Sequence, residues 1–147
     1  LRGVLAEFIV ASTIDVLDSP REEWDAYDLI TKDGLKIEIK SSAYLQSWKQ
    51  KELSKISFGI QPTKVWEEFD KRSTEAKRQA DVYVFCLLAH KDKPTVNPLD
   101  LSQWEFYVLD TKMLNDKAPL QKTISLSSLL RLNPVKVSYS ELASLLI

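Results

Sequence analysis

The segment "LITKDGLKIEIKSS", residues 29–42, has the clearest structural pattern in the chain. From residue 35 to residue 40, apolar and charged side chains alternate strictly, which is typical of a β-strand with one apolar and one polar face. The apolar face would carry Leu35, Ile37 and Ile39, and the polar face Lys36, Glu38 and Lys40. The Asp33-Gly34 pair in front of this strand predicts a tight turn, so residues 26–42 are expected to form a β-hairpin.

The length of the turn determines where Asp28 lies. A two-residue turn would place Asp28 opposite Ile39 on the apolar face, where an unpaired carboxylate is costly. A three-residue loop over residues 32–34, with Gly34 in the left-handed conformation, places Asp28 opposite Glu38 instead. The hydrophobic pattern favours this second register, because it keeps the apolar side chains of both strands on one face.

In this register, two carboxylates face each other. The β-carbons of directly opposed residues lie about 5 Å apart, so Asp28 and Glu38 would repel each other. Two close carboxylates are also what Mg²⁺ or Mn²⁺ takes as protein ligands, and the Ile39 carbonyl offers a further oxygen. Lys40, on the same strand face, is placed to polarise a phosphate or to help activate an attacking water. The alternative interpretation is a solvated strand face with chance carboxylates.

Asp25 is a second candidate for the acidic position on the first strand. It lies three residues before Asp28. This odd spacing would place it on the opposite face of the strand. Asp28 is therefore the preferred ligand, and we expect Asp25 to lie in a loop.

The motif formed by "YDL" at residues 27–29 and "IEIK" at residues 37–40 resembles that of the PD-(D/E)XK nuclease superfamily, which has the restriction-endonuclease-like fold. The resemblance implies an α/β fold with a mixed central β-sheet flanked by helices and an α-β-β-β-α-β core. It also implies hydrolysis of DNA phosphodiester bonds with Mg²⁺ or Mn²⁺ as cofactor. The class would be that of restriction, repair or resolvase-like nucleases.

The same resemblance assigns roles to individual residues. Asp28, Glu38 and Lys40 would be catalytic, together with Glu7 from the preceding helix. The implied metal ligands are Asp28, Glu38, Glu7 and the Ile39 carbonyl. The chain departs from the family pattern at Tyr27, which stands where the eponymous proline would be, and the Gln-and-Tyr motif of RecB-like members is not recognisable.

Residues after the hairpin are candidates for binding nucleic acid. Ser41 and Ser42 suit what some resolvase-like and Mrr-like members show near DNA. Lys49 and Lys51 follow, interleaved with the aromatic side chains of "YLQSWKQK" at residues 44–51. Such a mixture suits phosphate contacts and base stacking. The alternative is a solvated loop with two core aromatics.

The remaining patterns predict the following elements: a helix over residues 2–16 with an apolar stripe at 4, 5, 8, 9 and 11, a third strand over 55–61, a helix from 62 to 80, strands over 81–89 and 104–110, and a helix over 139–146. The strand over 81–89 is nearly all apolar, so it should be buried on both faces. In the helix from 62 to 80, Lys77 and Arg78 are expected on the wetter faces. Ser138 and Glu141 predict a capping box for the last helix.

Composition excludes several classes of site. One cysteine and one histidine exclude an internal disulfide and zinc sites built on several such residues. We expect a single domain over residues 1–147, a cytoplasmic location, DNA as partner and no association with membranes. A chain that begins at Leu1 leaves room for upstream residues. With no evident specificity domain, a homodimer or a partner domain would supply specificity; the rival hypothesis is an inactive module of the same fold that binds nucleic acid or a protein.

Overall fold

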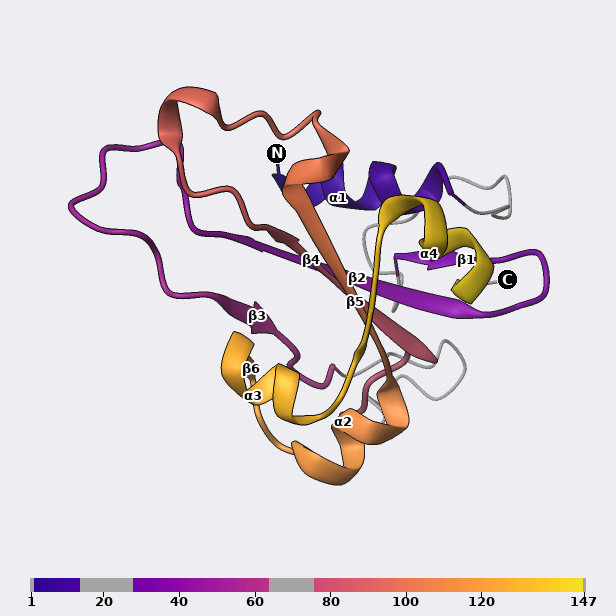
Figure 1. Ribbon diagram of the computed structural model, residues 1–147. Helices are drawn as coiled ribbons and strands as arrows, with labels where there is room; N and C mark the ends of the chain where they lie inside the picture. The colour runs from indigo at the N-terminus through magenta and orange to yellow at the C-terminus, as the bar shows by residue number, and fades with distance from the viewer. Residues whose placement is uncertain (1, 14–27, 64–75, 147) are drawn as a thin grey trace, which may run out of the picture.

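The computed structural model describes residues 2–13, 28–63 and 76–146 and shows a mixed α/β fold (Figure 1). Its main sheet has five strands in the order β1-β2-β4-β5-β7. These strands are β1 (Leu29–Ile30), β2 (Lys36–Ala43), β4 (Val82–Leu88), β5 (Trp104–Asp110) and β7 (Val135–Val137). β2 runs parallel to β4, and the other neighbouring strands are antiparallel. The mixed sheet confirms the predicted fold class and is compatible with a restriction-endonuclease-like fold.

Helices and a second, smaller sheet cover the two faces of this main sheet. The helix α1 (Arg2–Ala11) and the helix α4 (Tyr139–Leu146) lie on one face. The other face is covered by the two-stranded sheet of β3 (Ser57–Gly59) and β6 (Thr123–Ser125), and by the helices α2 (Thr111–Lys117) and α3 (Leu126–Arg131). Two short 3₁₀ turns, η1 (Lys93–Thr95) and η2 (Leu101–Gln103), lie between β4 and β5.

The strand β4 is the central strand of the main sheet, and every one of its residues is buried. Val82, Val84 and Cys86 pack toward α1 and α4, while Tyr83 and Phe85 pack toward β3. An apolar run of this kind can be satisfied only by cover on both faces. The prediction for residues 81–89 is therefore confirmed.

The chain after residue 55 differs from the prediction in two ways. The third strand does not join the hairpin in the main sheet, because β3 pairs with β6 from the C-terminal half of the chain. The helix expected from 62 to 80 lies mostly outside the described residues, but its last part, 76–80, is not helical, and Lys77 forms a β-bridge with Thr63. A strand-like bridge satisfies the backbone groups that a helix would otherwise have paired.

The prediction for Arg78 is also wrong, because this side chain is only 6% exposed rather than on a wet face. Its guanidinium donates to the carbonyl oxygens of Ile60, Ala118 and Gln121, and to the side chain of Asn115 at 3.0 Å. A buried charge is tolerated only when it is hydrogen-bonded in this way. Arg78 thereby ties the segment before β4 to the residues around α2.

The helix α1 is rotated relative to its expected apolar stripe. Ala6, Ile9 and Val10 are its buried side chains, whereas Val4 and Phe8 are 68% and 69% exposed. The small side chain of Ala6 allows the helix to approach β2 closely, which the count of large apolar residues did not indicate. Residues 14–16, the end of the expected helix, lie outside the described residues.

At the C-terminus, the prediction for residues 139–146 is confirmed by α4. The Glu141 carboxylate accepts hydrogen bonds from the backbone N and from Oγ of Ser138, at 3.1 and 2.8 Å. This is half of the expected capping box. In the described part of the chain, no helix combines the length and the apolar character needed to cross a membrane.

Candidate active site

The hairpin has the predicted register. Leu29 pairs with Ile37, and Ile30 pairs with Lys36. The loop contains three residues, and its last one, Gly34, has φ +89°, the left-handed conformation that glycine adopts at little cost. Leu29, Ile37 and Ile39 consequently face α1, and Glu38 and Lys40 face the opposite side of the sheet.

Asp28 lies where the ladder between β1 and β2 ends. Its backbone N donates to the Ile37 carbonyl at 3.0 Å, and its Oδ2 accepts from the backbone N of Ile39 at 2.7 Å. The side-chain carboxylate thus accepts the Ile39 N–H, which in a continued β-ladder would be bound by a backbone carbonyl of the partner strand. The side chain is 8% exposed, so the structure holds this carboxylate in a defined, nearly buried position beside β2.

Glu38 and Lys40 are next to each other on the polar face of β2. The Lys40 Nζ lies 3.6 Å from Oε1 of Glu38, and both side chains are partly exposed. They are spaced two residues apart on a strand, which places both on the same face. In this arrangement, the Glu38 carboxylate can bind a cation, and the neighbouring Lys40 ammonium can bind an anion such as a phosphate.

Tyr83 is a member of this site that sequence reasoning missed. It lies beside Glu38 in the parallel pairing of β2 with β4 and is nearly buried. The pKa of the Tyr83 hydroxyl is raised to about 12, chiefly by burial; the charges of Glu38 and Asp28 add to this effect, and Arg78 opposes it. The charges of both carboxylates therefore act on the Tyr83 hydroxyl.

The raised pKa of Tyr83 predicts an alkaline loss of stability. Between pH 10 and pH 12, the folded protein keeps this proton while the unfolded chain loses it, so the contribution is complete below pH 10 and disappears toward pH 12. At about 1.4 kcal/mol per pKa unit, the loss would reach about 3 kcal/mol. In Tyr83→Phe, the free energy of unfolding in denaturant should therefore decline less between pH 9 and pH 11 than in the wild type. Tyr139→Phe, on the other face of the sheet, is the control, and an equal decline in all three proteins would contradict the prediction.

Glu7 lies on the flank of α1, half-buried. It is one helical turn after Gly3, whose missing β-carbon would lie 4.0 Å from the Oγ of Ser41 in β2. Residues four apart share a helix flank, so Glu7 also lies on the flank that borders β2. Within residues 2–13, 28–63 and 76–146, no group of three or more acidic, histidine or cysteine side chains is close enough to hold a metal ion. Glu7 as a third ligand stays a prediction.

The donor set of Asp28, Glu38 and the Ile39 carbonyl fits a hard cation. All three offer oxygen, and Mg²⁺ commonly takes only one or two carboxylates, with waters and substrate phosphates completing its coordination. The second oxygen of Asp28 is not used in the bond with Ile39. A pair of carboxylates is therefore sufficient for the ion that the hairpin motif implies. Asp25 and Tyr27 lie outside the described residues.

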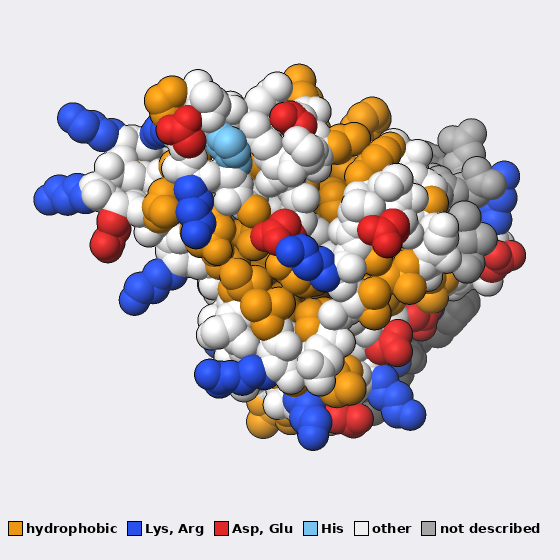
Figure 2. Space-filling view, in the orientation of Figure 1, with side chains coloured by type: hydrophobic (Ala, Val, Ile, Leu, Met, Phe, Trp, Pro, Cys, Tyr) orange, Lys and Arg blue, Asp and Glu red, His pale blue; other side chains and the backbone are white. Residues whose placement is uncertain are grey.

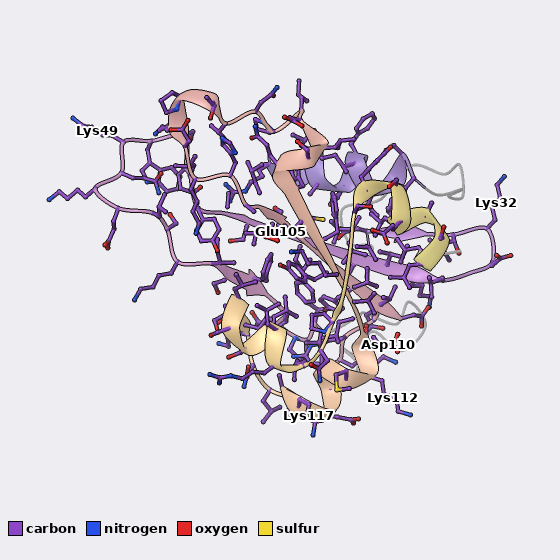
Figure 3. All side chains as sticks on the ribbon, in the orientation of Figure 1. Lys32, Lys49, Glu105, Asp110, Lys112 and Lys117 are labelled. Carbon is purple, nitrogen blue, oxygen red and sulfur yellow. The ribbon has the colours of Figure 1, made fainter. Side chains whose placement is uncertain are left out.

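The candidate nucleic-acid residues are divided between several places. Ser41 faces α1, whereas Ser42 is buried on the face that carries Glu38 and Lys40. Lys49 and Lys51 are exposed in the loop after β2. Figure 3 shows Lys49 at the opposite end of the molecule from Lys32 in the hairpin turn. Of these four residues, only Ser42 lies on the strand face of the candidate site.

Comparison with known families decides the kind of protein. Residues 1–128 match the family model described as bacteriophage T4 endonuclease IV. The chain belongs to the bacteriophage T4 endonuclease IV family. No curated protein matches the chain in a sequence search. Membership in this endonuclease family supports a nuclease with DNA as its substrate, and it favours an enzyme over the inactive binding module.

Proposed function

We propose that this protein of the endonuclease IV family is a PD-(D/E)XK-type endonuclease that hydrolyses DNA phosphodiester bonds with Mg²⁺ or Mn²⁺. The main support for the proposal is the arrangement of three side chains at the hairpin. The Asp28 carboxylate accepts from the Ile39 backbone N, and Glu38 and Lys40 lie beside each other on the polar face of β2. The match to an endonuclease family independently supports the cleavage of DNA, but not the PD-(D/E)XK class or the metal. The helix α1 before the hairpin and the parallel pairing of β2 with β4 are compatible with a restriction-endonuclease-like fold.

Each residue of the site has a defined task in this proposal. Asp28, Glu38 and the Ile39 carbonyl would hold the cation, with Glu7 assisting. When bound, the cation supplies a Lewis acid that polarises a phosphoryl oxygen and favours deprotonation of water. Lys40 would stabilise the negative charge that develops on the phosphate oxygens while the water oxygen bonds to phosphorus and the bond to the leaving oxygen breaks.

The bond between Asp28 and Ile39 matters for this task because it orients the carboxylate in advance. A carboxylate that must be ordered at each binding event loses conformational entropy, whereas one held by a backbone N–H at 2.7 Å does not.

The first test is magnesium binding, measured as a melting temperature without any substrate. Mg²⁺ at about ten times its Kd should stabilise the wild type by about 1.4 kcal/mol, a rise of about 4 °C. In Asp28→Asn, the side-chain oxygen can still accept from Ile39, but the charge is lost, so the rise should largely vanish. Asp33→Asn, an exposed acid in the loop of the same hairpin, is the matched control and should keep it. A full magnesium shift in Asp28→Asn would refute the metal site.

The second test is nicking of supercoiled plasmid DNA by the purified protein. Cleavage should require Mg²⁺ or Mn²⁺ and stop with EDTA. Cleavage that continues at full rate in EDTA would contradict the proposed cofactor while leaving the family assignment intact.

A further inference from the structure

Two loops meet at the end of the sheet where the parallel strands β2 and β4 finish. Ala43 pairs with Leu88, so the loop that follows β2 and the loop that follows β4 leave the sheet side by side. A hydrogen bond of 2.9 Å from the Nζ of Lys93 to the Trp48 carbonyl joins them. In open α/β sheets, ligands commonly bind beyond the carboxyl ends of parallel strands.

These loops concentrate positive charge. Residues 44–55 and 90–96 contain five lysines and two acids, although the chain as a whole has a formal charge of −1. All five lysines are exposed, and Figure 2 shows Lys and Arg side chains gathered at this end of the molecule. We call this surface the lysine end; its basic residues are Lys49, Lys51, Lys55, Lys91 and Lys93.

The lysine end contains a hollow that is large enough for part of a nucleotide. Its volume is about 590 Å³, within the roughly 300–1,000 Å³ typical of small-ligand pockets. Leu45, Trp48 and Val96 give it apolar walls, while Arg2 and Lys93 give it positive charge. A smaller hollow of about 360 Å³ shares Leu45 and Lys93 with it and is bordered by Lys49 and Lys51. Apolar walls with a basic rim match a nucleotide, which has an apolar base face and an anionic phosphate.

Trp48 is the aromatic group of this hollow. Its side chain is 63% exposed, whereas Trp104, in the core, is 5% exposed. The Trp48 indole therefore contributes little to the core, and its flat face is available to a ligand. Stacking of a base on an aromatic side chain strengthens binding of a nucleic-acid strand by roughly 5- to 150-fold.

Arg2 adds an unused hydrogen-bond donor. Its Nη1 donates to the Gln46 side-chain oxygen at 2.9 Å, but its Nε is buried and has no hydrogen-bond partner within the described residues. A buried donor without a partner destabilises the protein, so a ligand that supplies an acceptor is favoured. Because Arg2 lines the hollow, a small shift of its guanidinium would bring this donor to an oxygen of a bound nucleotide.

We propose that the lysine end holds the substrate DNA beyond the cleavage site, with a base stacked on Trp48, a nucleotide oxygen on Arg2 and neighbouring phosphates on the lysines. This inference rests on the proposed function for its substrate, but it assigns a different surface. Ala43 lies five residues beyond Glu38 on β2, which corresponds to roughly 16 Å along the strand. About five phosphates of one DNA strand cover that distance.

The test is binding of a fluorescein-labelled oligodeoxythymidine of about 20 nucleotides, measured by anisotropy in EDTA, so that neither cleavage nor metal binding contributes. Trp48→Ala should raise the Kd about 10-fold. Trp48→Phe, which keeps a stacking surface, should recover most of the affinity. Phe8→Ala removes an equally exposed aromatic side chain on α1 and should leave the Kd unchanged. Equal affinities of Trp48→Ala and wild type would overturn the proposal.

The salt dependence of the same Kd tests the lysines. Lys49→Glu with Lys51→Glu should reduce the slope of log Kd against log salt by about 1.4, because two phosphate contacts no longer release counterions. Lys112→Glu with Lys117→Glu, on α2, changes the net charge equally and should leave the slope unchanged (Figure 3). Equal slopes for both double variants would overturn the assignment of this surface.

These outcomes are separable from those of the proposed function. If all lysine-end variants bind the oligonucleotide as the wild type does, while the wild type nicks DNA with Mg²⁺, the further inference fails and the nuclease stands. If Trp48→Ala weakens binding but Asp28→Asn keeps its full magnesium shift, the surface stands and the metal site fails.

Discussion

Glu38→Ala and Lys40→Ala are each expected to abolish divalent-dependent cleavage of DNA, with a loss of at least about 100-fold, the usual cost of removing one group that stabilises transition-state charge. Both side chains lie on the partly exposed face of β2, where they pair with each other at 3.6 Å. Their truncation leaves no cavity in the core, so the variants should fold. The measurement is the rate of plasmid nicking at saturating Mg²⁺, with circular dichroism as the check on folding.

The matched control is Lys32→Ala, at the exposed tip of the same hairpin (Figure 3). It removes the same charge at a distance from the carboxylates and should keep the wild-type rate. A Glu38 or Lys40 variant that retains most of the wild-type rate would exclude that residue from the chemistry. The magnesium shift then separates the two roles: Glu38→Ala should lose it, whereas Lys40→Ala should keep it, because a lysine is not a ligand of Mg²⁺.

Arg78→Ala is expected to destabilise the fold more than any other single change considered for this protein. It removes the donor for three carbonyl oxygens and for Asn115, in an environment where the side chain is nearly buried. Each buried acceptor left without a partner costs about 1–3 kcal/mol, so a loss of about 4 kcal/mol is expected even if water reaches some of them. The melting temperature should fall by about 10 °C.

Lys77→Ala is the control for this prediction. Lys77 precedes Arg78 in the chain and pairs with Thr63 through its backbone only, while its side chain is exposed. Its truncation should change the melting temperature by no more than about 1–2 °C. A similar melting temperature for both variants would mean that the hydrogen bonds of Arg78 contribute no net stability.

The hairpin could be read from the sequence because its pattern is local. Strict alternation from residue 35 to residue 40 sets the two faces of β2, and the glycine of the turn sets the loop length, so one register satisfies both. The same holds for β4, where an apolar run admits only burial on both faces, and for the start of α4, where Ser138 and Glu141 are close in the chain.

Local pattern was not sufficient for the ends of the ladder. The register from Leu29 to Ile30 is as expected, but Asp28 leaves the ladder and places its carboxylate on the Ile39 amide. The Asp28 carboxylate can either point toward Glu38 or accept a hydrogen bond from the strand backbone. Residue spacing cannot distinguish these two orientations, because the register of the hairpin is the same in both. The difference determines which oxygen of Asp28 accepts from the Ile39 amide.

Local sequence pattern was enough to predict the hairpin, the central strand, the α/β class and the candidate carboxylates, since each depends on residues close in the chain. Which other residues lie next to these carboxylates depends on the tertiary structure. Tyr83 lies beside Glu38, and the loop of Trp48 beside that of Lys93, only because β2 and β4 pair in parallel across more than forty intervening residues. Arg78 is buried because distant carbonyls surround it. A parallel pairing and a buried charge have no periodic signature, because the free energy that selects them comes from partners remote in the sequence.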